Sequence, residues 1–205
     1  MTLQRFAVSE LLETPWKNGG GTTREVACWP LGAGLDSFDW RVSIATIAAG
    51  GPFSAFPGID RTIMLLDGAG VRLRSRDASI DQRLDEPLAP FNFPGESALN
   101  CELLGGASSD LNVMVRRDRL DAEVCVVRQT AEFATAPHGL LLALRGNWTL
   151  ELRGDAEDDI QSVRLAGTEG VWWGGASHAI ALEGSGIDAA LIAAIFRRKA
   201  PIQSA

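Results

Sequence analysis

Short apolar segments that alternate with polar residues fill most of this chain and restrict it to a mostly β fold. Hydrophobic side chains recur at every second position rather than at helical spacing, and glycine, proline, asparagine or aspartate interrupts them about every eight to twelve residues. Helix is expected only at residues 7–12, as one short turn. Strands are predicted at residues 40–47, 61–66, 71–74, 111–115, 124–127, 140–144, 148–152 and 189–196.

The composition predicts an ordered globular protein. Of the 205 residues 46% are hydrophobic, which is enough for a buried core, whereas the net charge of -7 argues against the basic face that phosphate binding needs. Residues 1–10 do not resemble a signal peptide, and no apolar run reaches membrane-spanning length. The three cysteines lie in strand-like apolar contexts, which favours buried reduced thiols. We therefore expect a cytoplasmic protein with no nucleic-acid or membrane partner.

A weak internal duplication is visible when the chain is compared with itself. Residues 63–74 resemble residues 141–153, and residues 103–117 resemble residues 181–198; in both pairs the matching Gly or Asp lies 78 residues further on. Units of strand, glycine turn and strand look alike in many β proteins, so the likeness also has a plain explanation. We predict two fused small β-barrels packed as one globular unit: residues 1–120 with a ligand pocket, and residues 121–205 with a structural role.

The two copies differ in polarity along one strand. Asp110, Asn112, Met114 and Arg116 occupy alternate positions, so a β conformation places all four on one face. The second copy has alanine and isoleucine at the positions that follow Asp188. If these strands line barrel interiors, only the first barrel has a polar interior. The alternative is that Asn112 and Arg116 face water.

A second strand supports a polar interior. In residues 40–45 the large apolar side chains share one face, and Arg41 projects from the other. An inward guanidinium is costly unless it meets a carboxylate from a ligand or from the protein. The candidate internal partners are Glu25, Asp60 and Asp110.

Residues 16–23 (WKNGGGTT) combine a lysine, an amide, three glycines and two hydroxyls. Consecutive glycines let the backbone approach a ligand and expose several N–H groups, which together with Lys17 suit an anionic oxygen. The lysine precedes the glycines, so this is not a nucleotide-binding P-loop. The plain alternative is a flexible turn that leads into a strand.

A loop rich in glycine and proline spans residues 50–61 and ends in Asp60 and Arg61. The planar fork of Arg61 could clamp a carboxylate with two hydrogen bonds. In the structural alternative, Asp60 and Arg61 only pair with neighbours. Phe53 and Phe56 are expected to pack at the rim rather than to stack on a ligand.

Other catalytic arrangements are mostly absent from the sequence. His138 and His178 are the only histidines and have no His or Glu at ligand spacing, which argues against a His-rich metal centre. No G-x-S-x-G motif marks a nucleophile, so a catalytic triad is disfavoured. General acid/base chemistry by Glu25, Asp60 or Lys17 stays open.

Four motifs resemble the HutD/Ves family: PWKNGGGTTREV at residues 15–26, WRVS at 40–43, FSAFPGIDR at 53–61 and DLNVMVRR at 110–117. The resemblance implies a cupin-like fold of two fused barrels, a bicupin. It also implies a regulatory protein of histidine utilisation that binds a small carboxylate such as urocanate or formyl- or formimino-glutamate. No catalytic activity comes with the resemblance, and no metal or other cofactor is expected.

The sequence thus predicts a binding protein for a small carboxylate, and not an enzyme as the first choice. The alternatives are a metal-free hydrolase or isomerase with Glu25 or Asp60 as the base, and a protein-interaction module. Exposed edge strands would be compatible with a homodimer. The expected ligand-facing residues are Lys17, Asn18, Gly20, Thr22, Arg41, Arg61, Asn112 and Arg116.

Overall fold

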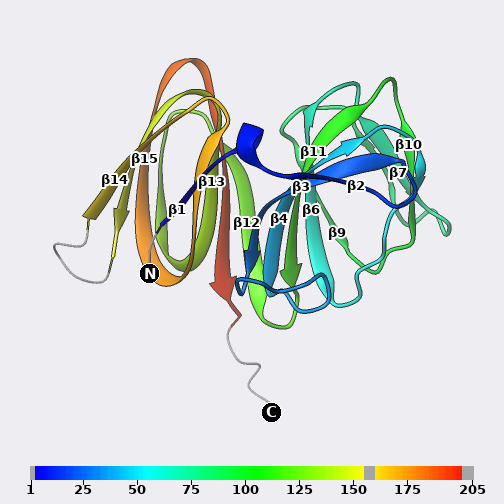
Figure 1. Ribbon diagram of the computed structural model, residues 1–205, viewed down its shortest axis with the longest axis horizontal. Helices are drawn as coiled ribbons and strands as arrows, with labels where there is room; N and C mark the ends of the chain where they lie inside the picture. Colours follow the sequence, from blue (N-terminus) through cyan, green and yellow to red (C-terminus); the bar gives the residue numbers. More distant parts are fainter. Residues whose placement is uncertain (1–2, 155–159, 200–205) are drawn as a thin grey trace. The chain divides into compact units, whose positions relative to one another are not determined.

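A computed structural model describes residues 3–154 and 160–199 of the chain. Across these ranges the regular elements are strands and one 3-10 turn, η1 (Val8–Glu10), with no α-helix. None of the helical structure in the described part of the chain is long and apolar enough to span a membrane. The chain divides into two compact units, one of Leu11–Asp118 and one of Met1–Glu10 with Arg119–Ala205 (Figure 1).

The unit of Leu11–Asp118 contains two antiparallel sheets. One has six strands in the order β2 (Glu13–Pro15), β3 (Gly21–Trp29), β4 (Trp40–Ile47), β11 (Ser108–Arg116), β6 (Ile59–Asp67) and β9 (Pro90–Pro94). The other has four strands in the order β5 (Gly51–Pro52), β10 (Leu99–Leu103), β7 (Val71–Ser75) and β8 (Asp81–Leu84). Buried residues of both sheets form one apolar cluster, which includes Ile47, Ile63, Leu73, Phe93 and Leu99.

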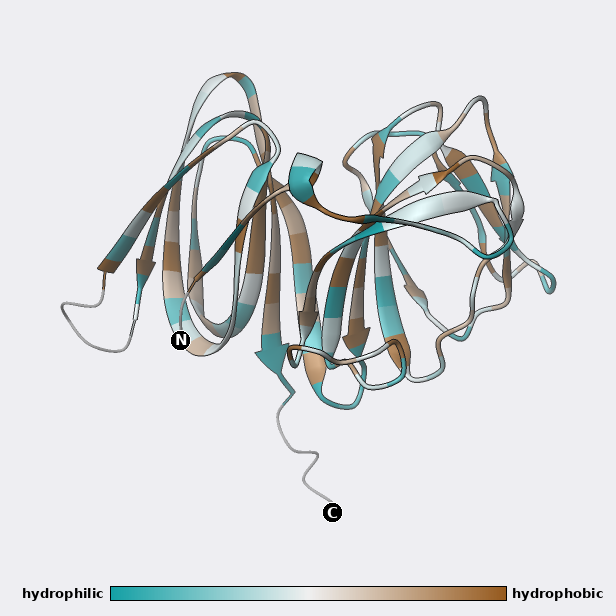
Figure 2. Ribbon diagram, in the orientation of Figure 1, coloured by the Kyte–Doolittle hydropathy of each residue, from teal (hydrophilic) through white to brown (hydrophobic). Residues whose placement is uncertain are grey.

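The other unit is built on two very long strands, β13 (Thr130–Arg153) and β15 (Glu169–Arg198). They pair along two separate stretches, so that Leu140 of β13 lies between Trp172 and Ala194 of β15. Three further strands complete this sheet: β1 (Gln4–Ala7), β12 (Leu120–Val127) and β14 (Ile160–Ala166). Figure 2 shows apolar residues along the strands of this unit, and the side chains of its core are almost entirely hydrophobic.

All eight predicted strand segments lie in strands, which confirms the mostly β class, and the helical turn is η1. The predicted division at residue 120 is wrong for the first ten residues. β1 pairs with residues Glu169–Trp172 of β15 and therefore belongs with the C-terminal unit. The cysteines are free, with Cys28 and Cys101 buried and Cys125 partly buried.

Candidate anion-binding pocket

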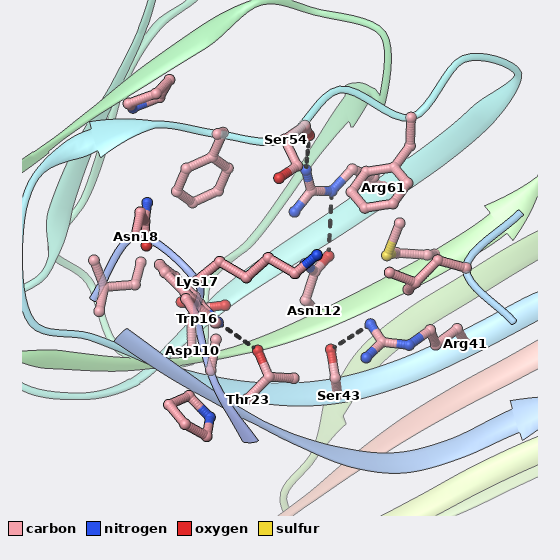
Figure 3. A pocket seen from close by; sticks show the side chains of 18 residues that line it. Trp16, Lys17, Asn18, Thr23, Arg41, Ser43, Ser54, Arg61, Asp110 and Asn112 are labelled. Carbon is pink, nitrogen blue, oxygen red and sulfur yellow. Dashed lines mark hydrogen bonds between the residues drawn. The ribbon is translucent and has the colours of Figure 1, made fainter. Parts of the chain in front are cut away.

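A cavity of about 510 Å³ lies within the unit of Leu11–Asp118. Its walls come from β3, β4, β6 and β11 and from the segments that follow β2 and β5 (Figure 3). Aromatic and apolar side chains make up part of the wall, and polar or charged groups converge on the rest. The polar and charged lining residues are Lys17, Asn18, Thr23, Arg41, Ser43, Ser54, Arg61, Asp110 and Asn112.

The period of two along the strands selects which side chains reach the cavity. On β11 the lining residues are Asp110, Asn112 and Met114, whereas Leu111 and Val113 between them are fully buried in the opposite direction. β4 follows the same rule, with Arg41, Ser43 and Ala45 in the cavity wall. The two strands are antiparallel neighbours, and Asn112 lies opposite Ser43. The polar faces of both strands therefore meet in one cavity.

Arg61 is a nearly buried cation in the wall, with 5% of its surface exposed. Its guanidinium lies over the rings of Phe53, Phe56 and Phe93, at 5.4, 5.5 and 5.0 Å from their centroids. Phe53 and Phe56 thus line the cavity around the cation, whereas the sequence predicted only that they pack at the rim.

The hydrogen bonds of Arg61 leave part of its fork available. Nε donates to Asn112 Oδ1 at 3.4 Å, and Nη1 donates to the Ser54 carbonyl at 3.2 Å. Burial lowers the pKa of Arg61 to about 10, with Asp110 opposing that change, so the side chain stays charged at neutral pH. Within the described part of the chain, Nη2 forms no hydrogen bond of its own.

Arg41 meets an internal carboxylate, as expected for an inward guanidinium. Its Nε donates to Glu25 Oε2 at 2.7 Å and its Nη1 to Ser43 Oγ at 3.1 Å. Glu25 is therefore the partner among the three carboxylates considered from sequence. Asp60 instead accepts a hydrogen bond from Arg117 at 2.5 Å.

Asp110 was absent from the expected ligand-facing set, although it was weighed as a partner for Arg41. It is 5% exposed, and none of the residues that the structure describes forms a hydrogen bond with its Oδ2. Burial raises the pKa of Asp110 to about 7, and the nearby charge of Arg61 opposes this rise. The sequence signal for it was the strand alternation that places it on the face of Asn112.

The glycine-rich segment is a structured turn. Gly19 has a φ of 70°, which favours glycine, and its N–H donates to the Trp16 carbonyl. The Gly20 N–H donates to Asn18 Oδ1 at 3.0 Å. A Cβ on Gly21 would lie 2.2 Å from the Thr46 carbonyl oxygen, so a glycine is needed there. The amides of Gly19 and Gly20 donate within the turn, and Gly20, expected to face a ligand, is not among the residues that line the cavity.

Two more expected residues lie outside the cavity wall. Thr22 is outside the wall, whereas its neighbour Thr23 lines the cavity, and Thr23 Oγ1 accepts a hydrogen bond from Trp16 Nε1 at 2.7 Å. Arg116, at the end of β11, donates from Nε to the Phe38 carbonyl and from Nη2 to the Asp36 carbonyl, at 3.1 and 3.2 Å. Its guanidinium therefore holds a loop. Lys17, Asn18, Arg41, Arg61 and Asn112 are the expected residues that the cavity brings together.

The pocket does not fit a divalent metal. It offers a single carboxylate among three cationic side chains, and metal binding would add positive charge to an already basic cavity. Within residues 3–154 and 160–199, no three His, Cys, Asp or Glu side chains are grouped as metal ligands. His138 Nδ1 accepts the Gly175 N–H at 3.1 Å, and His178 makes an edge contact with Trp173 in the other unit.

The fold has solved counterparts among cupin-like β proteins. YlbA from E. coli superposes with a TM-score of 0.71 at 12% identity, covering 98% of this chain and 93% of that one. HutD from Pseudomonas fluorescens SBW25 gives a TM-score of 0.80 at 27% identity, covering 97% of this chain and 100% of that one. A mostly β, cupin-like protein with a basic pocket is thus the class defined by the fold and the site.

Sequence relatives specify the family. The HutD family matches residues 8–191. Protein Ves from Cronobacter sakazakii is 35% identical over 181 residues, which is 88% of this chain and 92% of that protein. An uncharacterized 21.2 kDa protein in the hutC 3' region of Pseudomonas putida is 42% identical over 125 residues, 60% of this chain and 63% of that protein. The chain belongs to the HutD family.

Proposed function

We propose that this protein binds a small organic carboxylate in the pocket and acts as a regulatory component of histidine utilisation. The observation that carries the proposal is Arg61, a charged guanidinium held between aromatic rings with donor capacity left over. A planar guanidinium recognises a carboxylate with two parallel hydrogen bonds. Lys17 lines the same cavity and forms no ion pair among the described residues, so the pocket carries an excess of positive charge.

The family supports the choice of ligands. HutD from P. fluorescens and the protein in the hutC 3' region of P. putida carry names that connect this family with histidine utilisation. Carboxylates of that route include urocanate and formyl- and formimino-glutamate. These acids combine one or two carboxylates with flat, unsaturated or amide groups, which suit a cavity lined by Trp16, Phe53 and Phe56.

The same proposal includes the bicupin architecture. Gly68 and Gly146, the glycines at equivalent places in the two similar stretches, have positive φ values of 96° and 80°. Gly68 lies between β6 and β7 and Gly146 lies within β13, and at both an added Cβ would lie 2.7 Å from a backbone carbonyl oxygen. These shared glycine conformations support two cupin-like barrels that arose by duplication, of which the first carries the ligand pocket.

Thermal shift with urocanate, formylglutamate and formiminoglutamate tests the binding proposal. A ligand at one hundred times its Kd is expected to add about 2.7 kcal/mol to the free energy of unfolding. Arg61→Met, which keeps an unbranched side chain between the rings, should abolish the shift. Arg83→Met changes an exposed arginine of the same unit and serves as the matched control. A panel that leaves the melting temperature unchanged, or an equal shift in Arg61→Met, rules the proposal out.

One observation favours a second function, a metal-free enzyme that acts on such an acid. Asp110 is a buried carboxyl in the cavity whose pKa of about 7 suits a general base near neutral pH. Glu25 and Asp60, the bases expected from sequence, are instead held by Arg41 and Arg117. NMR of the candidate acids with protein at high concentration separates the two functions, because a binder leaves the acids unchanged and an enzyme converts them.

A further inference from the structure

Asp110 is a buried carboxyl whose hydrogen-bonding capacity the protein does not use. It lies on β11 between Ala45 of β4 and Leu65 of β6, and both neighbours are apolar. Its side chain lines the cavity, yet Oδ2 is sealed from solvent and has no hydrogen-bond partner among residues 3–154 and 160–199. An unsatisfied buried acceptor destabilises a fold, so its retention in a pocket wall suggests a use in recognition.

The obvious internal partner is turned elsewhere. Arg61 is close enough to oppose the rise in the pKa of Asp110, but its Nε and Nη1 donate to the neutral oxygens of Asn112 and Ser54. The cavity therefore presents a donor and an acceptor separately: the remaining fork of Arg61, and the carboxyl group of Asp110. A ligand that satisfies both must carry an anionic oxygen and a hydrogen-bond donor.

We propose that Asp110 is a specificity-determining residue, whose carboxylate accepts a hydrogen bond from an N–H group of the bound acid. The pocket then selects carboxylic acids that also carry an N–H donor over carboxylic acids that lack one. This inference rests on the carboxylate-binding function proposed above. The flat walls formed by Trp16, Phe53 and Phe56 favour an N–H in a planar group, such as an aromatic ring or an amide.

The charges around Asp110 give the two ligand classes different pH dependence. The pKa of Arg61 is lowered only to about 10, so Arg61 stays protonated near neutral pH, and the pKa of the nearby Cys101 thiol is raised to about 12. Arg41 and Lys17 are the other basic side chains of the cavity wall. The pKa of Asp110, at about 7, lies between pH 6 and 8. An acid without an N–H brings a second negative charge and favours neutral Asp110, so its affinity falls as the pH rises. An acid with an N–H brings the same charge, but its N–H donor favours the ionised form of Asp110, so its affinity rises relative to that of the first class as the pH rises.

Two matched acids test this assignment: 3-(1H-pyrrol-2-yl)propanoate, with a ring N–H, and 3-(furan-2-yl)propanoate, with an oxygen in its place. Neither ring titrates between pH 6 and 8. Isothermal titration calorimetry at pH 8 should show the pyrrole acid binding about tenfold or more tightly than the furan acid. In buffers of different ionisation enthalpy, the furan acid should take protons up on binding, and the pyrrole acid should take up fewer protons or release them.

Variants assign the effect to Asp110. Asp110→Asn should remove the proton exchange for both acids and reduce the preference to a few-fold, and Asp110→Ala should reduce it further. Asp67→Asn, at the exposed end of β6, should behave as the parent protein does. Circular dichroism verifies that each variant is folded, and one folded Asp110 variant is enough to carry out the test. Equal affinities and equal proton exchange for the two acids overturn the role of Asp110 alone, whereas no binding of either acid at millimolar concentration overturns the carboxylate pocket as well.

Discussion

The interiors of the two units differ although both are lined by β-strands. Residues 189–196 of β15 are all apolar and at most 4% exposed, within a core that contains Trp148 and Trp173. β11 of the other unit places Asp110, Asn112 and Met114 against a cavity of about 510 Å³. Close packing stabilises the first interior, and incomplete packing with polar walls makes the second one able to hold a ligand. The difference places the candidate pocket in one unit and much of the stabilising apolar packing in the other.

The largest effect should come from truncating the packed interior. Trp148 is 1% exposed, and its Nε1 donates to the Arg145 carbonyl at 3.0 Å. Trp148→Ala should lower the free energy of unfolding by about 3–5 kcal/mol, because it leaves a large cavity. Asn112→Ala, in the wall of the existing cavity, should cost far less and should instead weaken carboxylate binding. Urea denaturation and calorimetry of both variants measure this contrast, and a similar loss of stability in the two would contradict it.

The next effect tests the polar wall through pH. The pKa of Asp110 is raised in the folded state to about 7 from an ordinary value of about 4. The folded protein then binds more protons than the unfolded chain between those values, so this group lowers stability as the pH rises from 4 to 7, with no further change above 7. Asp110→Asn removes that penalty.

The free energy of unfolding of Asp110→Asn minus that of the parent should therefore be larger at pH 8 than at pH 4, by on the order of 2–4 kcal/mol. Urea denaturation at a series of pH values measures the difference curve. The exposed variant Asp67→Asn provides the baseline. A difference curve that is flat across this range would mean that Asp110 is ionised as readily in the folded protein as in the unfolded chain.

A smaller effect should separate scaffold from site on β11 itself. Arg116 holds the loop carbonyls of Asp36 and Phe38 and lies outside the cavity wall. Arg116→Ala should cost about 1–2 kcal/mol of stability through these two hydrogen bonds and leave carboxylate affinity unchanged. Thermal unfolding and ligand titration on the same sample check both parts. A loss of affinity at full stability would return Arg116 to the binding site.

Alternation along strands carried much of the correct prediction. It identified the faces of β4 and β11, and with them Arg41 and Asn112, because a strand repeats every two residues whatever its surroundings. It could not show that Thr23 rather than Thr22 faces the cavity, because which residues of β3 face inward depends on where the preceding turn ends. A bulge later in β3, between Glu25 and Ala27, shows how easily that assignment changes.

Long-range contacts account for the rest. The role of Arg116 depends on carbonyls 78 and 80 residues away, and β1 joins β15 across most of the chain. In the turn of residues 16–21, the amide of Gly19 donates to the Trp16 carbonyl and the amide of Gly20 donates to Asn18. Residue types alone did not distinguish this turn from an anion-binding loop. Arg61 was identified by its chemistry, but its aromatic contacts come from two segments of the fold, Phe53 and Phe56 after β5 and Phe93 in β9.

The smallest effect concerns how much of the basic charge a ligand meets. Glu25 is about half exposed and neutralises Arg41, whose side chain is 12% exposed. Glu25→Gln keeps a neutral acceptor and should change stability by less than about 1 kcal/mol, because exposed ion pairs contribute little. The released charge of Arg41 should tighten carboxylate binding about twofold to fivefold at low ionic strength, and less in high salt. Glu13→Gln breaks a similar pair with Arg24 outside the cavity wall and should leave affinity unchanged. Equal affinities in the two variants would mean that Arg41 serves the fold and that Arg61 and Lys17 supply the charge that a ligand meets.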